Sequence, residues 1–325
     1  MRILVVGGAG YIGSVTVAQA LAAGHEVTVL DSLVNGHKAA VSHGAEFVKG
    51  DLASQEAIDC VLRDRRPEGV VYYAGFIAAG ESMEQPGRYF ANNVGGAINL
   101  LSAMASHGVR RFVFSSSAAV YGEPDAVPIP EEAPIQPVSP YGESKVVVEK
   151  LMPWFERLCG IKYVSLRYFN AAGATATLGE DHRPETHLIP LVLQVALGQR
   201  PALDLYGTDY PTPDGTCVRD YIHVQDLARA HLLALARSER GSGVYNLGNG
   251  RGFSNREVVE TARRVTGRPI AVRDSPRRAG DPAALVASNE KARTELGWEP
   301  QVTRLEEIIE SAWRWHQAHP SGYVD

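Results

Sequence analysis

Cysteine is scarce in this chain of 325 residues. The three cysteines, Cys60, Cys159 and Cys217, are odd in number and lie far apart. They form neither a CxxC pair nor a zinc-type pattern, so their spacing predicts no metal site. We therefore expect ordinary reduced thiols, as in a cytoplasmic protein.

Long apolar runs and blocks of one charge are also missing. Lys and Arg total 32 against 37 Asp and Glu, a net charge of −5, and basic residues do not alternate with aromatic ones. This pattern argues against a nucleic-acid partner. No apolar run approaches the roughly 18 residues that span a bilayer, which argues against a membrane protein. Arg2 leads directly into an apolar segment, so we expect no signal peptide.

Apolar residues make up 45% of the chain, enough for a large core, and its length suits two domains or one domain with an added lobe. In the first half, short β-rich runs alternate with helical patterns. The predicted strands are residues 3–7, 26–30, 45–48, 69–73, 111–114 and 162–167, and the helices are 14–23, 54–66, 88–107 and one starting near 140. This alternation predicts an α/β fold, a Rossmann-type doubly wound parallel sheet.

The second half is less regular. We predict loops at 171–185 and 201–219, helices at 187–197 and 224–237, a strand at 244–247, an irregular stretch at 273–287, and capping boxes at Ser254–Glu257 and Thr303–Glu306. The expected domains are a dinucleotide-binding unit at 1–170 and a smaller α/β substrate lobe at 171–325. Part of 219–250 is expected to pack back onto the first unit.

A glycine cluster follows the first predicted strand. Gly7, Gly8, Gly10 and Gly13 show both the GxGxxG and the GxxGxxG spacing just before a helix, which is the context of a phosphate-binding turn. Asp31 closes the second strand, near the expected place of an acid that binds the adenosine ribose. A carboxylate there repels a 2′-phosphate, so we predict NAD rather than NADP.

Tyr141 and Lys145 are four residues apart after Ser139 and Pro140, which suit a helix start. They therefore share a helix face. A neighbouring ammonium favours the phenolate and can lower the pKa of a tyrosine toward neutrality, as a general base needs. The alternative is a surface helix on which Tyr and Lys fall four apart by coincidence.

Five segments together resemble the extended short-chain dehydrogenase/reductase family, and within it the branch that epimerises UDP-hexoses at C4. They are Gly7–Ser14, Ser115–Gly122, Ser139–Gly142, Leu166–Asn170 and Arg219–Val224; Ala279–Ala283 and Leu296–Trp298 extend the likeness almost to the C-terminus. The resemblance implies reversible 4-epimerisation of UDP-glucose and UDP-galactose through a transient 4-keto sugar, with the hydride stored on tightly bound NAD. Family analogy also implies a homodimer built through helices 88–107 and 141–158.

The resemblance also implies a role for individual residues. Ser117, Tyr141 and Lys145 would be catalytic. The NAD residues would be Gly7, Gly10, Tyr11, Ile12, Gly13, Asp31, Asn35, Asp51, Leu52, Tyr73, Ala74, Gly75, Asn92, Tyr141, Lys145 and Phe169. The UDP-sugar residues would be Ser117, Tyr141, Asn170, His187, Leu188, Leu205, Tyr206, Arg219, Arg278, Asp281 and Leu285. For His187, helix capping or packing is the competing interpretation.

A few positions distinguish between alternative reactions and substrates within this family. Ala118 and Ala119 stand where dehydratases and decarboxylases of the family carry an acid, so elimination of water is disfavoured. Phe76 and Ile77 stand where many members have Lys after the Ala-Gly turn. Leu285, near the sugar C2 substituent by analogy, leaves UDP-N-acetylhexosamines or UDP-pentoses as alternative substrates. A non-catalytic NAD-binding regulatory protein is the remote alternative, since it would not need Ser117, Tyr141 and Lys145 together.

Overall fold

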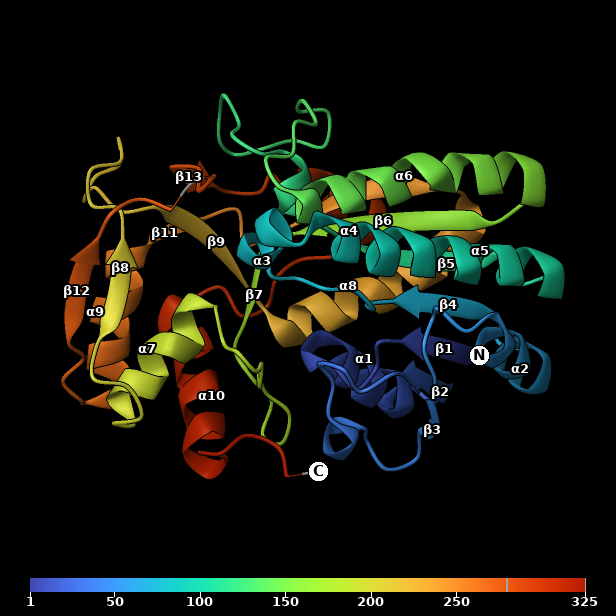
Figure 1. Cartoon of the computed structure of the whole chain (residues 1–325), viewed down its shortest axis with the longest axis horizontal. Coiled ribbons are helices and arrows are strands. Elements are labelled where there is room, and N and C mark those ends of the chain that lie inside the picture. Colours follow the sequence, from blue (N-terminus) through green and yellow to red (C-terminus); the bar gives the residue numbers. More distant parts are fainter. Residues whose placement is uncertain (279, 325) are drawn as a thin grey trace.

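The computed structural model describes residues 1–278 and 280–324, so Ala279 of the Ala279–Ala283 motif lies outside the described residues. Its centre is a seven-stranded parallel sheet in the order β10-β6-β5-β4-β1-β2-β3, which confirms the predicted fold class (Figure 1). These strands are β1 (Arg2–Val6), β2 (Glu26–Asp31), β3 (Glu46–Lys49), β4 (Gly69–Tyr72), β5 (Arg111–Ser117), β6 (Lys162–Tyr168) and β10 (Gly243–Leu247).

Helices cover both faces of this sheet. The α-helices of the described residues, those that lie away from this sheet included, are α1 (Tyr11–Ala22), α2 (Gln55–Arg65), α3 (Ala79–Glu84), α4 (Pro86–Tyr89), α5 (Gly96–His107), α6 (Pro140–Cys159), α7 (Leu188–Ala196), α8 (Val224–Arg237), α9 (Asn255–Thr266) and α10 (Leu305–Ala318). One apolar core joins β1 to α1 and α8, and a second joins the other face to α2, α5 and α6. Strands buried on both faces read as continuous apolar runs, as Ile3–Val6 does.

Two predicted helices differ in detail from the observed ones. The single helix expected at 88–107 is interrupted by a π-helical segment, Phe90–Gly95, between α4 and α5. Asn93 in this segment turns inward, accepts from the Phe76 N–H at 2.8 Å and donates to Ser144 Oγ at 3.1 Å. The predicted capping box at Thr303 is wrong, because α10 begins one residue later, with Arg304 as its N-cap. The box at Ser254 and Glu257 is present.

The second half of the chain contributes to the central sheet as well. β10 pairs in parallel with β6, and α8 packs against α1. The remaining strands are β7 (Asn170–Ala172), β8 (Leu203–Tyr206), β9 (Val218–His223), β11 (Gly252–Ser254), β12 (Val272–Ser275) and β13 (Ala284–Leu285). They form a four-stranded and a two-stranded sheet beside α7, α9 and α10 (Figure 1). The boundary at residue 170 and a separate lobe at 171–325 stay predictions.

The prediction of a loop at 201–219 was wrong in part, because this stretch contains β8 and the start of β9. β8 pairs with β12, from a stretch predicted to be irregular. This pairing joins segments far apart in sequence, which local patterns do not reveal. Within the described residues, no helix is both long and apolar enough to cross a membrane.

Candidate active site

A cavity of about 390 Å³ lies at the carboxyl ends of the central strands. Open parallel sheets bind their ligands at this edge. It is lined by every predicted cofactor residue except Lys145: Gly7, Gly10, Tyr11, Ile12, Gly13, Asp31, Asn35, Asp51, Leu52, Tyr73, Ala74, Gly75, Asn92, Tyr141 and Phe169.

The glycine turn between β1 and α1 forms one wall of this cavity. Gly7 has φ +80°, and a Cβ there would stand 2.7 Å from the Ala74 nitrogen. A Cβ at Gly13 would stand 2.2 Å from the Gly7 carbonyl oxygen, so neither position accepts a side chain. Helix α1 has no side-chain cap and no acid in its first turn. Its N-terminus therefore offers unshared N–H groups and a positive dipole end to a phosphate.

Asp31 lies at the end of β2, facing the same cavity. Its Oδ2 accepts from the Ala9 N–H at 2.9 Å and its Oδ1 from the Leu33 N–H at 2.8 Å, so the carboxylate is held in one orientation. Burial raises the pKa of Asp31, and these two hydrogen bonds oppose the rise. A fixed carboxylate beside a tight glycine turn fits the ribose and pyrophosphate of NAD.

Tyr141 stands at the start of α6, where Ser139 caps the helix by accepting from the Gly142 N–H at 3.2 Å. Its backbone N–H donates to Ser82 Oγ at 3.2 Å, and its ring is 9% exposed while still lining the cavity. Burial raises the pKa of Tyr141, and a hydrogen bond with Ser117 opposes this only in part. The direction is opposite to the lowered pKa that the sequence predicted, because burial disfavours the phenolate.

Lys145 lies one turn further along α6, on the same side of the helix as Tyr141. Its ammonium donates to the Ser115 carbonyl at 2.9 Å and stands 5.8 Å from the centre of the Tyr141 ring. Burial lowers the pKa of Lys145 to about 8, opposed by Glu149. Most Lys145 side chains therefore carry a proton at neutral pH, and the cation sits in a poorly solvated position close to the tyrosine.

The predicted substrate residues fall into two groups. Ser117, Tyr141, Asn170 and His187 line the cavity, whereas Leu188, Leu205, Tyr206, Arg219, Arg278, Asp281 and Leu285 do not. In the second group, Arg219 donates to the Pro282 carbonyl at 2.8 Å and stands 3.7 Å from Asp281. The guanidinium of Arg278 lies 3.9 Å from the centre of the Tyr206 ring. Leu205 is buried.

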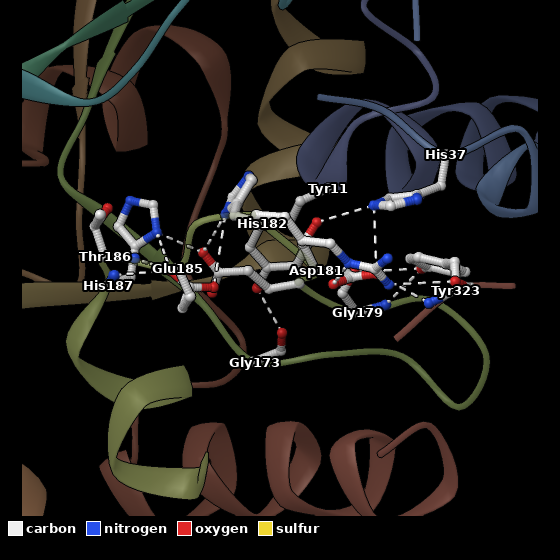
Figure 2. A network of polar contacts seen from close by, with 12 residues as sticks. Tyr11, His37, Gly173, Gly179, Asp181, His182, Glu185, Thr186, His187 and Tyr323 are labelled. Carbon is white, nitrogen blue, oxygen red and sulfur yellow. Dashed lines mark hydrogen bonds and ion pairs between the residues drawn. The ribbon is translucent and has the colours of Figure 1, made fainter. Parts of the chain in front are cut away.

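Among the cavity-wall residues that sequence reasoning missed are a glutamate and a histidine, Glu180 and His182. With Glu185 and His187 they form a compact group, which we call the His–Glu cluster. Figure 2 shows His182, Glu185 and His187 turned toward one another beside Tyr11. Glu180 Oε1 lies 2.8 Å from His187 Nδ1 and 3.1 Å from His182 Nδ1. The spacing ExHxxExH in residues 180–187 was the available signal.

His187 is the N-cap residue of α7, but its side chain makes no capping hydrogen bond. The imidazole pairs instead with Glu180 and Glu185, so the capping alternative is wrong. Burial alone would lower the pKa of His187, but the two carboxylates raise it to about 10. Burial alone would likewise raise the pKa of Glu180, but the two imidazoles hold it well below its usual range.

Known proteins resemble the chain along its whole length. The model of the NAD dependent epimerase/dehydratase family matches residues 3–248. A UDP-glucose 4-epimerase of Lacticaseibacillus casei is 52% identical over 329 residues, which cover 100% of this chain and 99% of the relative. A UDP-glucose 4-epimerase crystal structure superposes with a TM-score of 0.97 at 49% identity, covering 100% of both chains.

A further crystal structure, of a Bifidobacterium longum UDP-glucose 4-epimerase with NAD+ and UDP, has a TM-score of 0.95 at 36% identity, and covers 99% of this chain and 100% of that one. The likeness to these proteins, in sequence and in fold, thus extends over the whole length of the chain, including the glycine turn and the Tyr141 helix. The chain belongs to the NAD dependent epimerase/dehydratase family.

Proposed function

We propose that this protein interconverts UDP-glucose and UDP-galactose by epimerisation at C4, using NAD. The observation that carries the proposal is the convergence of Ser117, Tyr141 and Lys145 beside a cavity built by the dinucleotide turn. The relatives named above are UDP-glucose 4-epimerases, and the B. longum structure contains NAD+ and UDP.

The residues that would hold NAD are those of the glycine turn, Asp31, and the other predicted cofactor residues that line the cavity. When bound, NAD supplies a site that accepts a hydride from C4 of the sugar and gives it back. Tyr141 removes the proton of the 4-hydroxyl and later returns it. Ser117, hydrogen-bonded to Tyr141, would also hold the reacting oxygen.

Lys145 supplies the charge that this chemistry needs. Burial disfavours the Tyr141 phenolate, so a cation close to the ring is required to make it accessible near neutral pH. Lys145 keeps its proton over most of that range, because its pKa is about 8. Its ammonium donates a hydrogen bond to the Ser115 carbonyl, which holds the side chain in one position.

The residues after Ser117 favour epimerisation over dehydration within this family. Ala118 and Ala119 form the short 3₁₀ helix Ala118–Val120, and neither side chain can transfer a proton. Tyr141 would therefore act alone as acid and base in both half-reactions at one carbon. Removal of water from a neighbouring carbon needs a second proton-transfer group, which these two positions do not provide.

The UDP moiety would be held by Asn170, His187, Leu188, Leu205, Tyr206, Arg219, Arg278 and Asp281, with Leu285 beside the sugar. Arginine forks suit a diphosphate. Arg219 already donates to two backbone carbonyls, which limits how far it can move to reach a ligand.

We also propose a homodimer located in the cytoplasm. The dimer proposal is supported by exposed apolar side chains on α5 and α6, two helices that pack against each other: Ile98 is 39% exposed, Trp154 57% and Leu158 74%. The cytoplasmic location is supported by three free thiols, Cys60, Cys159 and Cys217.

The function is tested by incubating the purified protein with UDP-glucose and no added NAD. We expect UDP-galactose to form until the two sugars reach equilibrium, because cofactor retained from expression is regenerated in each turnover. Accumulation of a keto sugar or of free NADH would contradict the proposal. UDP-N-acetylglucosamine and UDP-xylose, assayed in parallel, report the sugar preference.

The Tyr141→Phe variant is the matched control, because it removes one hydroxyl from a buried ring. We expect turnover to fall by about 10²- to 10⁴-fold, the usual contribution of a general acid–base. Bound NAD, measured by its release on denaturation, should stay at the wild-type level. Full activity in this variant would remove Tyr141 from the mechanism.

A further inference from the structure

The His–Glu cluster has the composition of a metal site. Glu180, His182, Glu185 and His187 each offer one ligand atom, and these atoms lie within 4.8 Å of one another. We propose that these four side chains bind one divalent transition-metal ion, zinc by preference, in the wall of the NAD cavity. The cysteine spacing predicted no metal site; the proposed ligands are imidazole and carboxylate groups instead.

The distances between the ligand atoms suit a tetrahedral ion. Glu180 Oε1 lies 3.1 Å from His182 Nδ1 and 2.8 Å from His187 Nδ1. The Glu185 carboxylate also faces both imidazoles, with Oε1 3.0 Å from His187 Nδ1 and Oε2 3.8 Å from His182 Nδ1. With Zn–N and Zn–O bonds of about 2.0–2.2 Å, the ligand atoms of a tetrahedral site stand roughly 3.3 Å apart. The observed distances bracket that value.

The charges of the cluster also suit an ion. The Glu180 and Glu185 side chains are only 6% and 5% exposed. Among the described residues, no Lys or Arg forms a salt bridge with either carboxylate. Once an ion displaces the imidazole protons, one divalent cation balances the two buried carboxylates, and histidine with carboxylate is a common ligand set for zinc.

The surroundings provide orientation and access. Glu185 Oε1 accepts from the backbone N–H groups of Thr186 at 2.7 Å and His187 at 2.8 Å, which orients this carboxylate as hydrogen bonds orient ligands in known metal sites. Glu180, His182 and His187 line the cavity, and the His187 side chain is 38% exposed. An ion can therefore enter from the cavity side.

The position of the cluster indicates a structural role for the ion. All four ligands belong to one stretch of eight residues, 180–187, in the segment that joins β7 to α7. The ion would therefore hold this segment in one conformation (Figure 2). The His182 ring packs edge-on against Tyr11 at 6.4 Å, and Tyr11 begins α1 in the glycine turn. Metal binding would thus stabilise the contact between this segment and the NAD-binding turn.

The competing interpretation is a cluster held by protons alone, with imidazolium–carboxylate hydrogen bonds and no ion. Protein with bound NAD and no polyhistidine tag is equilibrated with zinc, dialysed against metal-free buffer, and its metal measured by mass spectrometry. We expect about one zinc per chain, and saturating zinc should raise Tm by about 3–6 °C over chelator-treated protein. Cobalt substitution should give the intense visible absorption of a tetrahedral site.

The matched variants are His182→Gln, which removes one ligand, and His107→Gln. His107 also pairs with a carboxylate, Asp59, at 3.0 Å, but lies outside the cluster. We expect His182→Gln to weaken zinc binding by about 100-fold or more, and His107→Gln to leave it unchanged. If His182→Gln does not fold, the zinc content, Tm shift and cobalt spectrum of the wild type decide between a zinc site and a cluster held by protons alone.

Zinc absent from the dialysed wild type, together with an unchanged Tm and no tetrahedral cobalt spectrum, would overturn the proposal. Equal zinc in the wild type and in His182→Gln would overturn it as well. Metal content and spectra do not depend on turnover, so failure here leaves the proposed epimerase activity standing.

Discussion

Tyr141 and Lys145 show how burial alters what a short spacing implies. The four-residue spacing correctly placed both side chains on one face of α6. In the folded chain, burial raises the pKa of Tyr141 and lowers that of Lys145 to about 8. Both groups are therefore driven toward their neutral forms. The pKa of Lys145 moves toward neutrality, whereas that of Tyr141 moves away from it, so formation of the phenolate depends on the nearby cation.

Asp220 is a second buried ionisable residue, in a motif that carries the family resemblance. Its Oδ1 accepts from the Asn249 N–H at 2.7 Å, and its Oδ2 accepts from Gly250 at 3.0 Å and Ala287 at 3.1 Å. It thus joins β9 to two other segments. Burial raises the pKa of Asp220 to about 6, opposed by these three hydrogen bonds.

The raised pKa predicts a pH dependence of stability. Below pH 4 the carboxyl is protonated in both states. Between the ordinary pKa and about 6, the folded state binds more protons than the unfolded state. The contribution of Asp220 to stability is therefore lost as pH rises through this range. We expect the wild-type free energy of unfolding, minus that of Asp220→Asn, to fall by roughly 1 kcal/mol between about pH 5 and pH 7. Urea unfolding at both pH values measures this, and a difference that stays flat or rises contradicts the prediction.

At the scale of elements, α6 is fixed to the central sheet by a buried ion pair. Arg167 on β6 donates from Nη2 to Glu149 Oε2 at 2.6 Å and from Nε to Glu149 Oε1 at 3.0 Å. The two side chains are 8% and 10% exposed. Glu149 lies one turn beyond Lys145, so the pair holds the helix that positions both catalytic candidates.

Removing one partner of this pair should destabilise the fold strongly. Arg167→Met leaves the Glu149 carboxylate buried without its cation, and we expect a loss of about 3–5 kcal/mol in the free energy of unfolding. The double variant Glu149→Leu/Arg167→Met should recover most of that loss, because neither member of the pair is left as a buried charge without its partner. Urea titrations of the wild type and both variants test this. A single variant as stable as the wild type would show that the pair does not anchor α6.

At the scale of the whole molecule, α5 and α6 lie side by side (Figure 1). Both helices carry exposed apolar side chains. Trp154 and Leu158 stand on α6, and Ile98 stands on α5. Large exposed apolar groups on neighbouring helices are typical of a protein interface. A two-fold dimer would pair this face with the same face of a second chain.

Placing a charge on this face should separate the dimer. We expect Leu158→Glu to reduce the mass measured by light scattering from twice 35.1 kDa to 35.1 kDa, because a buried carboxylate without a partner opposes association. Val324→Glu is the control, since Val324 is 86% exposed but lies far along the chain, near the C-terminus. A wild type that is monomeric, or a Leu158→Glu variant that remains dimeric, contradicts the proposed interface.

Much of the architecture was predictable because its signals are local. Ile3–Val6 before a glycine turn, Asp31 after the second strand, and Ser139-Pro140 at the start of α6 each depend on a few neighbouring residues. β8 and the π-helical segment were missed, because the pairing of Leu203 with Val272 and the inward-turned Asn93 depend on partners distant in sequence.

The sequence by itself determined the parallel sheet and the dinucleotide turn, because periodicity and glycine spacing act over a few residues. The candidate catalytic residues followed from the resemblance of its motifs to the family. Only the tertiary structure decided the environment of those residues. Burial reversed the expected direction of the Tyr141 pKa. Chain packing also brought Glu180 and His182 into the cavity wall. The possible metal-ligand atoms of the His–Glu cluster lie within 4.8 Å of one another. Desolvation and the convergence of side chains depend on atoms from distant segments, so no local pattern specifies them.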